Sequence, residues 1–369
     1  MSVESHADHE FMARALQLAR RGLNTTDPNP RVGCVIVGDG RVVGEGWHQR
    51  AGEPHAERYA LEAAGPQAAG ATVYLTLEPC IHEGRTPPCA PALIQARVAR
   101  VVCAAEDPNP RVAGGGLAAL REAGIAVHTG IGRAEAEALN PGFNKRMRSG
   151  LPWVRIKLAA SIDGRTALAS GESRWITGAA ARADVHRWRA RSSAILTGIN
   201  TVLADDPQLD VRLGDDEPAF LAPQRAILDS RLQIPATART LALPGEVLVF
   251  TRSVDSVAIA ALEATGAGVI TLPGDGPLPL DQVLRRLGER EVNEVWVEAG
   301  ARLSGALIQQ GLADELFVYV APHILGDTAR GMFALGSLNN MAQRVEWQWQ
   351  EVRPVGDDLR LRLIPRSGV

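Results

Sequence analysis

The chain of 369 residues is long enough for two domains of ordinary size, and its 46% content of hydrophobic residues can build sizeable cores. Its net charge of −3 and isoelectric point near 6.3 argue against a nucleic-acid-binding protein, which needs clustered positive charge. The sequence has no signal-peptide pattern, no apolar run of membrane-spanning length and too few cysteines for a disulfide framework. We therefore expect a cytoplasmic protein with a small-molecule partner, without nucleic-acid or membrane partners.

Helical and strand periodicities alternate along the first half of the chain. In chain order they predict a helix over 10–21, strands over 32–37 and 41–47 joined by a Gly-Asp-Gly turn, a helix over 55–64, a strand over 72–77, a helix over 91–97, a strand over 100–105, a helix over 115–123 and a strand over 125–128. This alternation predicts a mostly parallel sheet covered by helices on both faces. In such sheets ligands bind beyond the carboxyl ends of the strands, where Cys80 and the Asp107 loop fall.

The segment from Pro54 to Cys89 has the residues of a catalytic zinc site. His55, Cys80 and Cys89 supply three nitrogen and sulfur ligands and leave a fourth position for water. Glu57 follows His55 at the start of a helix, which leaves its carboxylate free as a general acid and base. We expect both cysteines near helix N-termini, where the helix dipole stabilises a thiolate. A His-x-Glu motif followed by Pro-Cys and a second Cys is typical of zinc-dependent nucleobase deaminases.

The spacing of the cysteines leaves an alternative open. Residues 81–88 separate Cys80 from Cys89, whereas two residues separate the cysteines of the general deaminase signature. His82 lies in this loop, and a purely structural zinc site would take it as a fourth ligand. Cys34 and Cys103 lie within apolar runs, so we expect them in the core.

The hexapeptide Asp-Pro-Asn-Pro-Arg-Val occurs twice, at residues 27–32 and 107–112. Asp, Pro and Asn are the residues that loops use, so turn chemistry is one explanation. The other explanation is that Asn29, just before the first core strand, binds the edge of a substrate base through its amide.

A linker is predicted over 134–150, which divides the chain into domains of residues 1–147 and 148–369. The second domain is predicted to have a strand over 154–160, a helix over 179–191, strands over 194–197, 225–228, 246–250 and 268–272, a helix over 281–288, a strand over 294–298, a helix over 303–310, and strands over 315–322, 345–352 and 359–364. The last two strands have no helix between them, so we expect an antiparallel tail on a parallel sheet.

The second domain lacks a Gly-x-Gly-x-x-Gly motif, so a Rossmann dinucleotide-binding fold is not supported. The strand over 294–298 is followed by a glycine-bounded turn, 299–305, and then by an apolar helix. The free backbone N–H groups at the N-terminus of such a helix can bind an anion. A turn of this kind also commonly connects a strand to a helix without binding any ligand. Polar and glycine-containing segments at 157–165, 170–177 and 201–207 strengthen the interpretation of this turn as an anion site.

Over nearly its whole length the chain resembles the bifunctional riboflavin-biosynthesis deaminase/reductase family. The matching motifs are Asp27–Pro30, His55–Glu57, Glu78–Cys80, Gly84–Cys89, Lys157–Arg165, Ser170–Thr177, Thr201–Pro207 and Val297–Gly300. The resemblance implies two α/β domains, a cytidine-deaminase-like three-layer α/β/α domain followed by a dihydrofolate-reductase-like domain. It also implies that zinc hydroxide displaces the 2-amino group of a diaminopyrimidinone ribosyl phosphate, and that NADPH then reduces the ribosyl group to ribityl.

The resemblance implies roles for individual residues as well. His55, Cys80 and Cys89 would bind one zinc ion, and Glu57 would transfer protons. The residues implied to face NADPH are Ala159, Trp175, Thr201, Asp205, Ser230, Gly300, Ala301, Arg302, Leu303, Ser304, Gly305 and Ala306. Those implied to hold the substrate, with Asn29 in the first domain, are Ser173, Arg189, Leu209, Arg212 and Glu298. A guanidinium fork suits a sugar phosphate, although a solvated surface charge also explains either arginine.

Two other classes of function remain open. A nucleic-acid base-editing enzyme shares the zinc motif but needs a basic or aromatic groove for a single strand, and the first domain has few aromatic residues. A zinc-stabilised binding module would tolerate loss of Glu57 but not loss of a zinc ligand. We expect a homo-oligomer, either a dimer or a tetramer.

Overall fold

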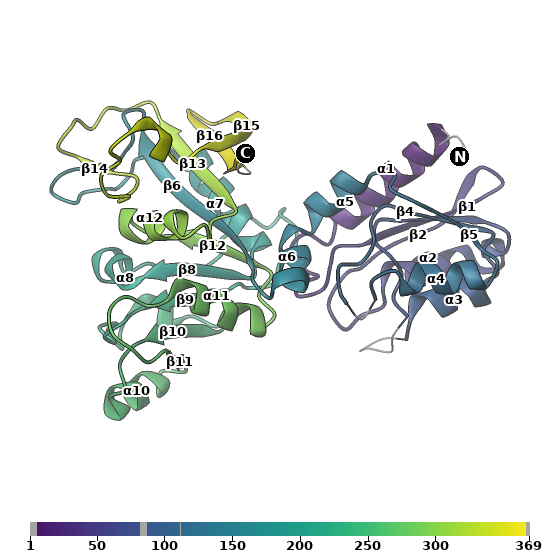
Figure 1. The fold of residues 1–369 in the computed structure, drawn as a ribbon, viewed down its shortest axis with the longest axis horizontal. Coiled ribbons are helices and arrows are strands. Elements are labelled where there is room, and N and C mark those ends of the chain that lie inside the picture. The colour runs from purple at the N-terminus through teal and green to yellow at the C-terminus, as the bar shows by residue number, and fades with distance from the viewer. Residues whose placement is uncertain (1–5, 82–86, 111, 367–369) are drawn as a thin grey trace. The chain divides into compact units, whose positions relative to one another are not determined.

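The computed structural model describes residues 6–81, 87–110 and 112–366, which fold into two compact units (Figure 1). Unit 1 spans Met1–Leu151 and unit 2 spans Pro152–Val369. The domain boundary predicted after residue 147 falls inside helix α6 (Pro141–Ser149), so the structure divides the chain just after this helix.

Unit 1 contains a five-stranded sheet in the order β2-β1-β3-β4-β5. Its strands are β1 (Gly33–Gly38), β2 (Arg41–Trp47), β3 (Thr72–Leu75), β4 (Arg100–Cys103) and β5 (Ala126–Thr129). The pairs β3–β4 and β4–β5 are parallel, whereas β1 runs antiparallel to both β2 and β3. The prediction of a mostly parallel sheet therefore holds only for β3 to β5, because the tight hairpin reverses the chain between β1 and β2.

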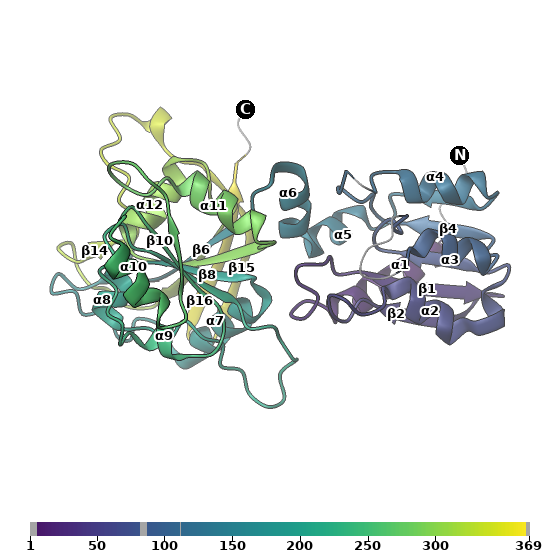
Figure 2. The ribbon, with the colours of Figure 1, turned by 90° about the horizontal axis from the view of Figure 1, so that it is seen from below.

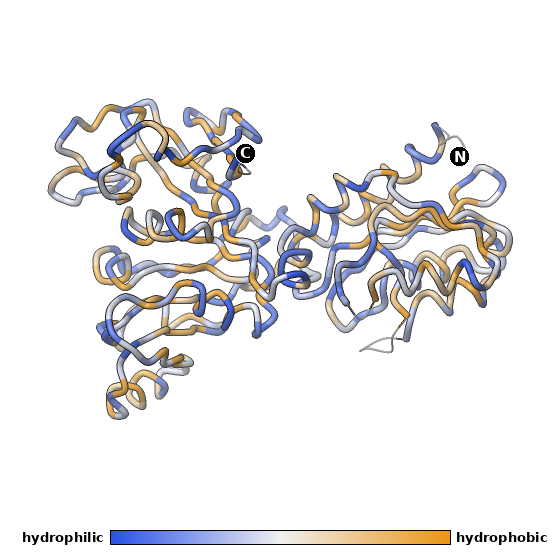
Figure 3. The backbone as a smooth tube through the Cα atoms, in the orientation of Figure 1, coloured by the Kyte–Doolittle hydropathy of each residue, from blue (hydrophilic) through white to orange (hydrophobic). Residues whose placement is uncertain are grey.

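Helices cover both faces of this sheet, as predicted (Figure 1). Cys34 and Ile36 face the core formed with α2 (Ala56–Ala64), α3 (Cys89–Gln95) and α4 (Gly115–Glu122). Val35 and Val37 face the core formed with α1 (His6–Arg20), α5 (Arg133–Leu139) and α6. This alternation is the period of two expected of a strand, and Figure 3 shows hydrophobic stretches along the strands of the sheet. The predicted burial of Cys34 and Cys103 is confirmed, since both are 0% exposed.

Two glycines bring helix α2 against strand β2. A Cβ atom on Gly44 would lie 2.2 Å from the carbonyl oxygen of Ala60, and one on Gly46 would lie 2.3 Å from that of Ala56. Glycine is thus required for the backbones to approach this closely. The contact fixes the N-terminal turn of α2, which carries Glu57 and begins beside His55.

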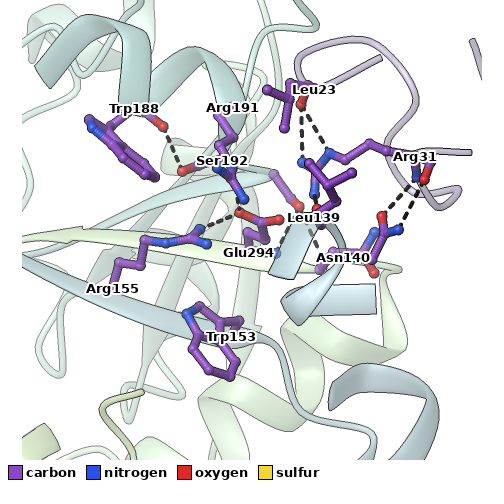
Figure 4. Close-up of polar contacts among 12 residues, drawn as sticks. Leu23, Arg31, Leu139, Asn140, Trp153, Arg155, Trp188, Arg191, Ser192 and Glu294 are labelled. Carbon is purple, nitrogen blue, oxygen red and sulfur yellow. Dashed lines mark hydrogen bonds and ion pairs between the residues drawn. The ribbon is translucent and has the colours of Figure 1, made fainter. Parts of the chain in front are cut away.

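The linker predicted over 134–150 is wrong, because this segment forms α5 and α6 within unit 1. Its Asn140 breaks the helix and binds the backbone of Arg31 twice, accepting from N–H at 2.8 Å and donating to the carbonyl oxygen at 3.0 Å. The Arg31 guanidinium in turn donates to the carbonyl oxygens of Leu23 and Leu139 (Figure 4). Asn-Pro-Gly here makes a helix-to-helix turn, which sequence reading did not distinguish from a flexible connection.

Unit 2 contains a nine-stranded sheet in the order β11-β10-β9-β8-β12-β6-β13-β16-β15. The strands are β6 (Trp153–Ser161), β8 (Ala194–Gly198), β9 (Gln224–Leu228), β10 (Val247–Thr251), β11 (Gly268–Thr271), β12 (Glu294–Glu298), β13 (Glu315–Ala321), β15 (Trp347–Val355) and β16 (Asp358–Pro365). Neighbours from β11 through β13 are parallel, and β16 and β15 add antiparallel pairs. The predicted antiparallel tail is confirmed. Short strands β7 (Arg165–Ala167) and β14 (Arg330–Gly331) pair separately.

Helices lie on both faces of the nine-stranded sheet. Figure 2 shows α7 (Ala179–Arg191) on one side and α11 (Leu280–Glu289) and α12 (Ala301–Gln309) on the other. The structure adds α8 (Ile199–Asp205), α9 (Arg239–Ala242) and α10 (Ser256–Glu263), which the sequence reading missed. Within the described residues, no helix has the length and apolar character needed to cross a membrane.

Candidate functional site

Three ligand atoms of the types that zinc prefers converge at one end of unit 1. His55 is the N-cap of α2, Cys89 is the first residue of α3, and Cys80 lies in the irregular segment after β3. The His55 Nδ1 atom is 3.6 Å from Cys80 Sγ and 3.4 Å from Cys89 Sγ, and all three ligand atoms lie within 4.8 Å of one another. Tetrahedral zinc would hold nitrogen and sulfur ligands about 3.5 Å apart. The donor set and its spacing therefore fit zinc.

Both cysteines lie near the start of α3, as expected, although Cys80 itself is not part of a helix. Its carbonyl oxygen accepts hydrogen bonds from the N–H groups of Cys89 at 3.1 Å and Ala90 at 3.0 Å. The hydrogen bond from the Cys89 thiol lowers the pKa of Cys80 to about 4, and the same interaction raises the pKa of Cys89. A bound dication would favour the thiolate form of both sulfur atoms.

Glu57 lies in the first turn of α2 beside this cluster, and its side chain is almost completely buried. Burial raises the pKa of its carboxyl group, and the side chain hydrogen-bonds with the Cys89 thiol. A buried carboxyl group with a raised pKa, next to a metal but outside its ligand set, suits proton transfer. His82, the candidate fourth ligand of a structural zinc site, lies outside the described residues together with 83–86.

Asn29 is linked to the cluster of His55, Cys80 and Cys89 through His48, a residue for which the sequence predicted no role. Its Nδ2 atom is 3.0 Å from Nε2 of His48, whose Nδ1 is 3.1 Å from the carbonyl oxygen of Pro54. Since a carbonyl only accepts, Nδ1 carries the proton and Nε2 accepts from the Asn29 amide. Burial lowers the pKa of His48 to about 4, which keeps this ring neutral. The Asn29 amide is thereby oriented, and the His48 ring packs edge-on against His55 with centroids 5.3 Å apart.

The second copy of the hexapeptide has a different environment. The Asp107 carboxylate accepts from the N–H of Asn109 at 2.8 Å, which is turn chemistry. The turn interpretation therefore fits residues 107–110, whereas Asn29 has the additional link to His48. Arg111, within the second copy, lies outside the described residues.

In unit 2, the segments predicted to face NADPH lie at the carboxyl ends of four adjacent strands, β9, β8, β12 and β6. Ser230 follows β9, Thr201 lies in α8 after β8, Gly300 follows β12, and Ala159 lies near the end of β6. The Thr197 hydroxyl donates to the carbonyl oxygen of Glu298 at 2.7 Å and so joins the ends of β8 and β12. Carboxyl ends of adjacent parallel strands are where α/β sheets bind ligands.

The turn before α12 leaves room for a ligand at its first residue. Gly300 is the N-cap, with φ −75°, and a Cβ atom added there would meet nothing within 4 Å. Arg302 is exposed, whereas Ser304 and Gly305 are buried and pack against the 334 loop, where a Cβ on Gly305 would lie 2.5 Å from the Ala334 oxygen. The open N-terminus of α12 fits a phosphate group, since free N–H groups and the helix dipole are available there.

The predicted substrate residues Arg189 and Glu298 form a buried pair. The Arg189 fork donates to both carboxylate oxygens, at 2.6 and 2.8 Å, and also to the carbonyl oxygen of Asp210 at 2.8 Å. Despite burial, this guanidinium lowers the pKa of Glu298 to about 2. Lys157 on β6 is directly across from Glu298 in the sheet, and burial lowers its pKa. No individual role was predicted for Lys157, which the structure brings to this pair.

The remaining predicted residues surround the same strand ends. Ser173 and Trp175 flank Arg174, whose guanidinium donates to the carbonyl oxygen of Asp205 at 2.8 Å. Leu209 is buried with a φ of 53°. Arg212 has a side chain that is 61% exposed.

His186, which the sequence reading missed, contacts Arg212. Its Nδ1 accepts from the Arg212 N–H at 3.0 Å. Burial, followed by the charges of Arg189 and Arg212, lowers the pKa of His186 to about 4. Isolated histidines such as His48 and His186 carry no local pattern that marks them, and only the folded chain shows their partners.

Two family models match the chain. The model of the cytidine and deoxycytidylate deaminase zinc-binding region matches residues 5–105, and the model of the RibD C-terminal domain matches residues 152–361. These matches confirm the predicted order of the two α/β domains and the predicted zinc cofactor.

Similar proteins match over nearly the full length of both chains. The riboflavin biosynthesis protein RibD of Escherichia coli (strain K12) is 51% identical, with 97% of this chain and 99% of that protein covered. The RibD structure from Acinetobacter baumannii, form 1, has a TM-score of 0.92 at 49% identity and covers 98% of this chain and 99% of its own. A diaminohydroxyphosphoribosylaminopyrimidine deaminase/5-amino-6-(5-phosphoribosylamino)uracil reductase from Thermotoga maritima has a TM-score of 0.86 at 33% identity, with 98% and 99% covered. The chain therefore belongs to the RibD family of bifunctional deaminases and reductases in riboflavin biosynthesis.

Proposed function

We propose that unit 1 hydrolytically deaminates 2,5-diamino-6-ribosylamino-4(3H)-pyrimidinone 5′-phosphate and that unit 2 then reduces the ribosyl group to ribityl with NADPH. The product of both steps would be 5-amino-6-ribitylamino-uracil 5′-phosphate. The observation that carries the first reaction is the convergence of His55, Cys80 and Cys89 beside the buried carboxyl group of Glu57. Hydrolytic deamination requires an activated water molecule and a group that accepts its protons. A zinc ion held by the three ligands would supply the water, and Glu57 would accept the protons.

In unit 1, we assign the proton transfers to Glu57. Zinc, when bound by His55, Cys80 and Cys89, supplies a water molecule that loses a proton near neutral pH. The water oxygen adds to C2 of the ring, and Glu57 carries the two protons of the water molecule, one to the ring nitrogen and one to the 2-amino nitrogen, so that the C2–N bond breaks and ammonia leaves. Asn29, oriented by His48, hydrogen-bonds the edge of the pyrimidine ring.

In unit 2, we assign NADPH to the four adjacent strand ends and the substrate to the α7 side of β12. NADPH supplies the hydride that reduces C1′ of the ribosyl group. Its diphosphate would lie at the N-terminus of α12, where Gly300 leaves space. The other NADPH contacts proposed are Ala159, Trp175, Thr201, Asp205, Ser230 and the α12 residues Ala301, Arg302, Leu303, Ser304, Gly305 and Ala306.

We propose different roles for the two substrate-site arginines, because Arg189 is paired with a carboxylate and buried whereas Arg212 is largely exposed. Arg189 already neutralises Glu298, and its side chain is only 11% exposed, so we assign this pair to the ribosyl hydroxyl groups. The Arg212 side chain is 61% exposed, which leaves its guanidinium accessible to the 5′-phosphate. Ser173 and Leu209 complete the proposed substrate contacts.

The experiment compares the full chain with its Glu57→Gln variant. We expect the variant to keep its zinc, since Glu57 is outside the ligand set, and to lose deamination by about 10²- to 10⁴-fold. Ammonia release, NADPH oxidation and metal content would be measured together. Supplying the deaminated compound should restore NADPH oxidation in Glu57→Gln, whereas Cys80→Ser should lose the metal. Near-normal ammonia release by Glu57→Gln would contradict the assignment.

We also propose that the protein is a homo-oligomer, a dimer or a tetramer, in the cytoplasm and without a nucleic-acid partner. The edge strand β15 supports self-association, because Trp349 and Val352 are 60% and 57% exposed on it. Exposed apolar residues on an edge strand favour pairing with another chain. Light scattering on the purified protein tests this proposal, and a monomer at micromolar concentration would contradict it.

A further inference from the structure

Helix α7 carries residues of the proposed substrate site along one stripe. Arg182, His186 and Arg189 are spaced four and three residues apart, so they share one face of the helix. The contacts of this face are Arg182 with the Trp175 ring at 4.4 Å, His186 with the Arg212 N–H, and Arg189 with Glu298. We call these three residues the site face of α7. Its position determines where Arg189 meets Glu298 and where Arg212 is held.

The opposite stripe of α7 is anchored by strand β16. Asp184 Oδ2 accepts hydrogen bonds from the Tyr319 hydroxyl at 2.6 Å and from Arg360 Nη1 at 2.7 Å. Arg360 also binds the Glu351 carboxylate of β15, and its own side chain is almost fully buried. Asp184 is thus fixed from two strands of the sheet, from β16 by Arg360 and from β13 by Tyr319.

The hairpin turn between β15 and β16 holds the start of the same helix. The N–H of the N-cap residue Gly178 donates to Asp358 Oδ2 at 2.8 Å. A Cβ atom on Gly356, which has a φ of 63°, would lie 2.8 Å from the Cβ of Ala180. Glycine at this turn therefore allows the hairpin to touch the first turn of α7.

Trp188 on the anchored stripe fixes the rotation of α7 against the sheet. Its ring is parallel to Trp296 at 6.0 Å and edge-on to Phe317 at 4.4 Å. The Arg360 and Arg362 guanidinium groups also lie over this ring, at 5.7 and 5.1 Å from its centroid. Figure 4 shows Trp188 at the end of α7, where its carbonyl oxygen accepts from the Ser192 hydroxyl.

We propose that the β15–β16 hairpin positions the substrate side of the reductase site through α7, with Arg360 as the positioning residue. The proposal rests on the reductase function proposed above. Asp184 and Arg189 lie within six consecutive residues of one α-helix, so a shift of the anchored face also displaces the site face. Misplacement of a binding group by about 1 Å can cost up to roughly 100-fold in rate.

The test is the Arg360→Met variant of the full chain, assayed with NADPH and the deaminated substrate. We expect the KM for this substrate to rise about tenfold, while the rate of deamination stays unchanged. The preference for the phosphorylated substrate over its dephosphorylated form should fall as well, because Arg212 is held by His186 on the site face. A purely structural role would not change this preference selectively. Arg360→Lys should restore part of it.

Arg362→Met is the matched control. It removes a guanidinium from the same face of β16, together with its bonds to Glu315 and Glu351 and its contact over Trp188, but leaves both hydrogen bonds to Asp184, from Arg360 and Tyr319. We expect its substrate KM to change by less than about threefold, well below the tenfold effect set for Arg360→Met. An equal rise in both variants would overturn the proposal, because the effect would then belong to the hairpin in general.

Two further variants separate the possible failures. Arg189→Ala tests the proposed substrate site directly, and an unchanged substrate KM there would refute the proposed site itself. If Arg189→Ala raises the KM and folded Arg360→Met does not, the positioning role alone is wrong. If Arg360→Met does not fold, Tyr319→Phe removes just one donor to Asp184, and an unchanged KM in that variant would also refute the positioning role.

Discussion

Glu78 is a buried carboxylate that holds the loop next to the metal ligands. Its two oxygens accept from four backbone N–H groups, those of Asp107, Gly114, Gly116 and Leu117, at 2.9 to 3.2 Å. Two of these groups belong to the first turn of α4, whose N–H groups have no partners within the helix. The side chain thus acts on the fold around Cys80 rather than on the substrate.

Replacing Glu78 with Ala should destabilise unit 1 by about 3 kcal/mol or more, because several buried N–H groups lose a charged acceptor together. Hydrogen exchange at Gly114, Gly116 and Leu117 should accelerate. Glu122→Ala on the exposed face of α4 serves as the control and should change stability by less than about 0.5 kcal/mol. Unaltered protection of those amides in Glu78→Ala would show that another group holds the loop.

His186 should make the stability of unit 2 depend on pH. Its pKa is about 4 in the folded chain, below the ordinary value of 6.5, because burial and the charges of Arg189 and Arg212 oppose protonation more than Glu298 and Asp210 favour it. Above pH 6.5 the ring is neutral in both states and has no effect. As pH falls from 6.5 towards 4, the unfolded chain binds a proton that the folded chain does not, so the free energy of unfolding falls.

The His186→Gln variant should lack this contribution. We expect the difference in unfolding free energy between the native chain and the variant to shift by about 1 kcal/mol between pH 7 and pH 4.5, after screening by solvent is allowed for. Urea unfolding at the two pH values measures it. A constant difference would mean that His186 titrates alike in both states.

The residues whose roles were predictable are those that the chain keeps close together. His55, Glu57, Cys80 and Cys89 lie within one short segment, and their types and order are specific to one kind of chemistry. Arg189 and Glu298 were selected only through resemblance, and the pairing between them spans 109 positions. No local pattern predicts such a pair, because sheet topology brings it together.

At the scale of single elements, α12 combines an open N-cap with a closely packed interior. Gly300 has a φ of −75° that any residue adopts, and its missing side chain faces open space. Gly305 in the same helix lies against the Ala334 oxygen. The two glycines therefore serve different purposes, one towards the proposed ligand and one towards the fold.

Gly300→Val and Gly305→Val should consequently fail in different ways. Gly300→Val should fold with nearly unchanged stability and raise the KM for NADPH, because the new side chain occupies the proposed diphosphate position. Gly305→Val should lose about 1–3 kcal/mol of stability, since its Cβ overlaps a backbone oxygen. Thermal unfolding and NADPH kinetics separate the two effects. Unchanged NADPH kinetics in folded Gly300→Val would place the cofactor elsewhere.

The elements whose bounds sequence reading predicted best are uninterrupted runs of residues that favour one conformation. The strand over 294–298 and the helix over 179–191 were predicted with the bounds that the structure shows. Helix α8 was missed because its seven residues carry Asn, Thr and Asp, which are typical of loops. Helix α10 begins at the N-cap Asp255, which accepts from the N–H groups of Val257 and Ala258. That cap was a signal available in the sequence.

At the scale of the whole molecule, the chain divides into two compact units, each with its own sheet and core. Asn140 and Arg31 tie α5 and α6 to unit 1, so a fragment must include both helices. Cutting after residue 147 would remove the last turn of α6. The division after Leu151 keeps it.

A fragment of residues 1–151 should therefore fold and release ammonia from the diaminopyrimidinone substrate without NADPH. A fragment of residues 1–132, which lacks α5 and α6, serves as the control and should be insoluble, because the core loses Leu139 and Phe143 and the residues packed against them become exposed. Circular dichroism and ammonia release measure both. Recovery of soluble 1–151 only on co-expression with 152–369 would mean that the units depend on each other.

The position of Lys157 beside Glu298 has a consequence for protein chemistry. The chain has two lysines, Lys145 in α6 and Lys157 in β6, so an amine-directed reagent has few side chains to modify. Burial lowers the pKa of Lys157, which leaves more of it in the nucleophilic amine form. Acylation at Lys157, read by mass spectrometry against Lys145 as an internal standard, would therefore report the occupancy of the reductase site in the intact enzyme without a turnover assay.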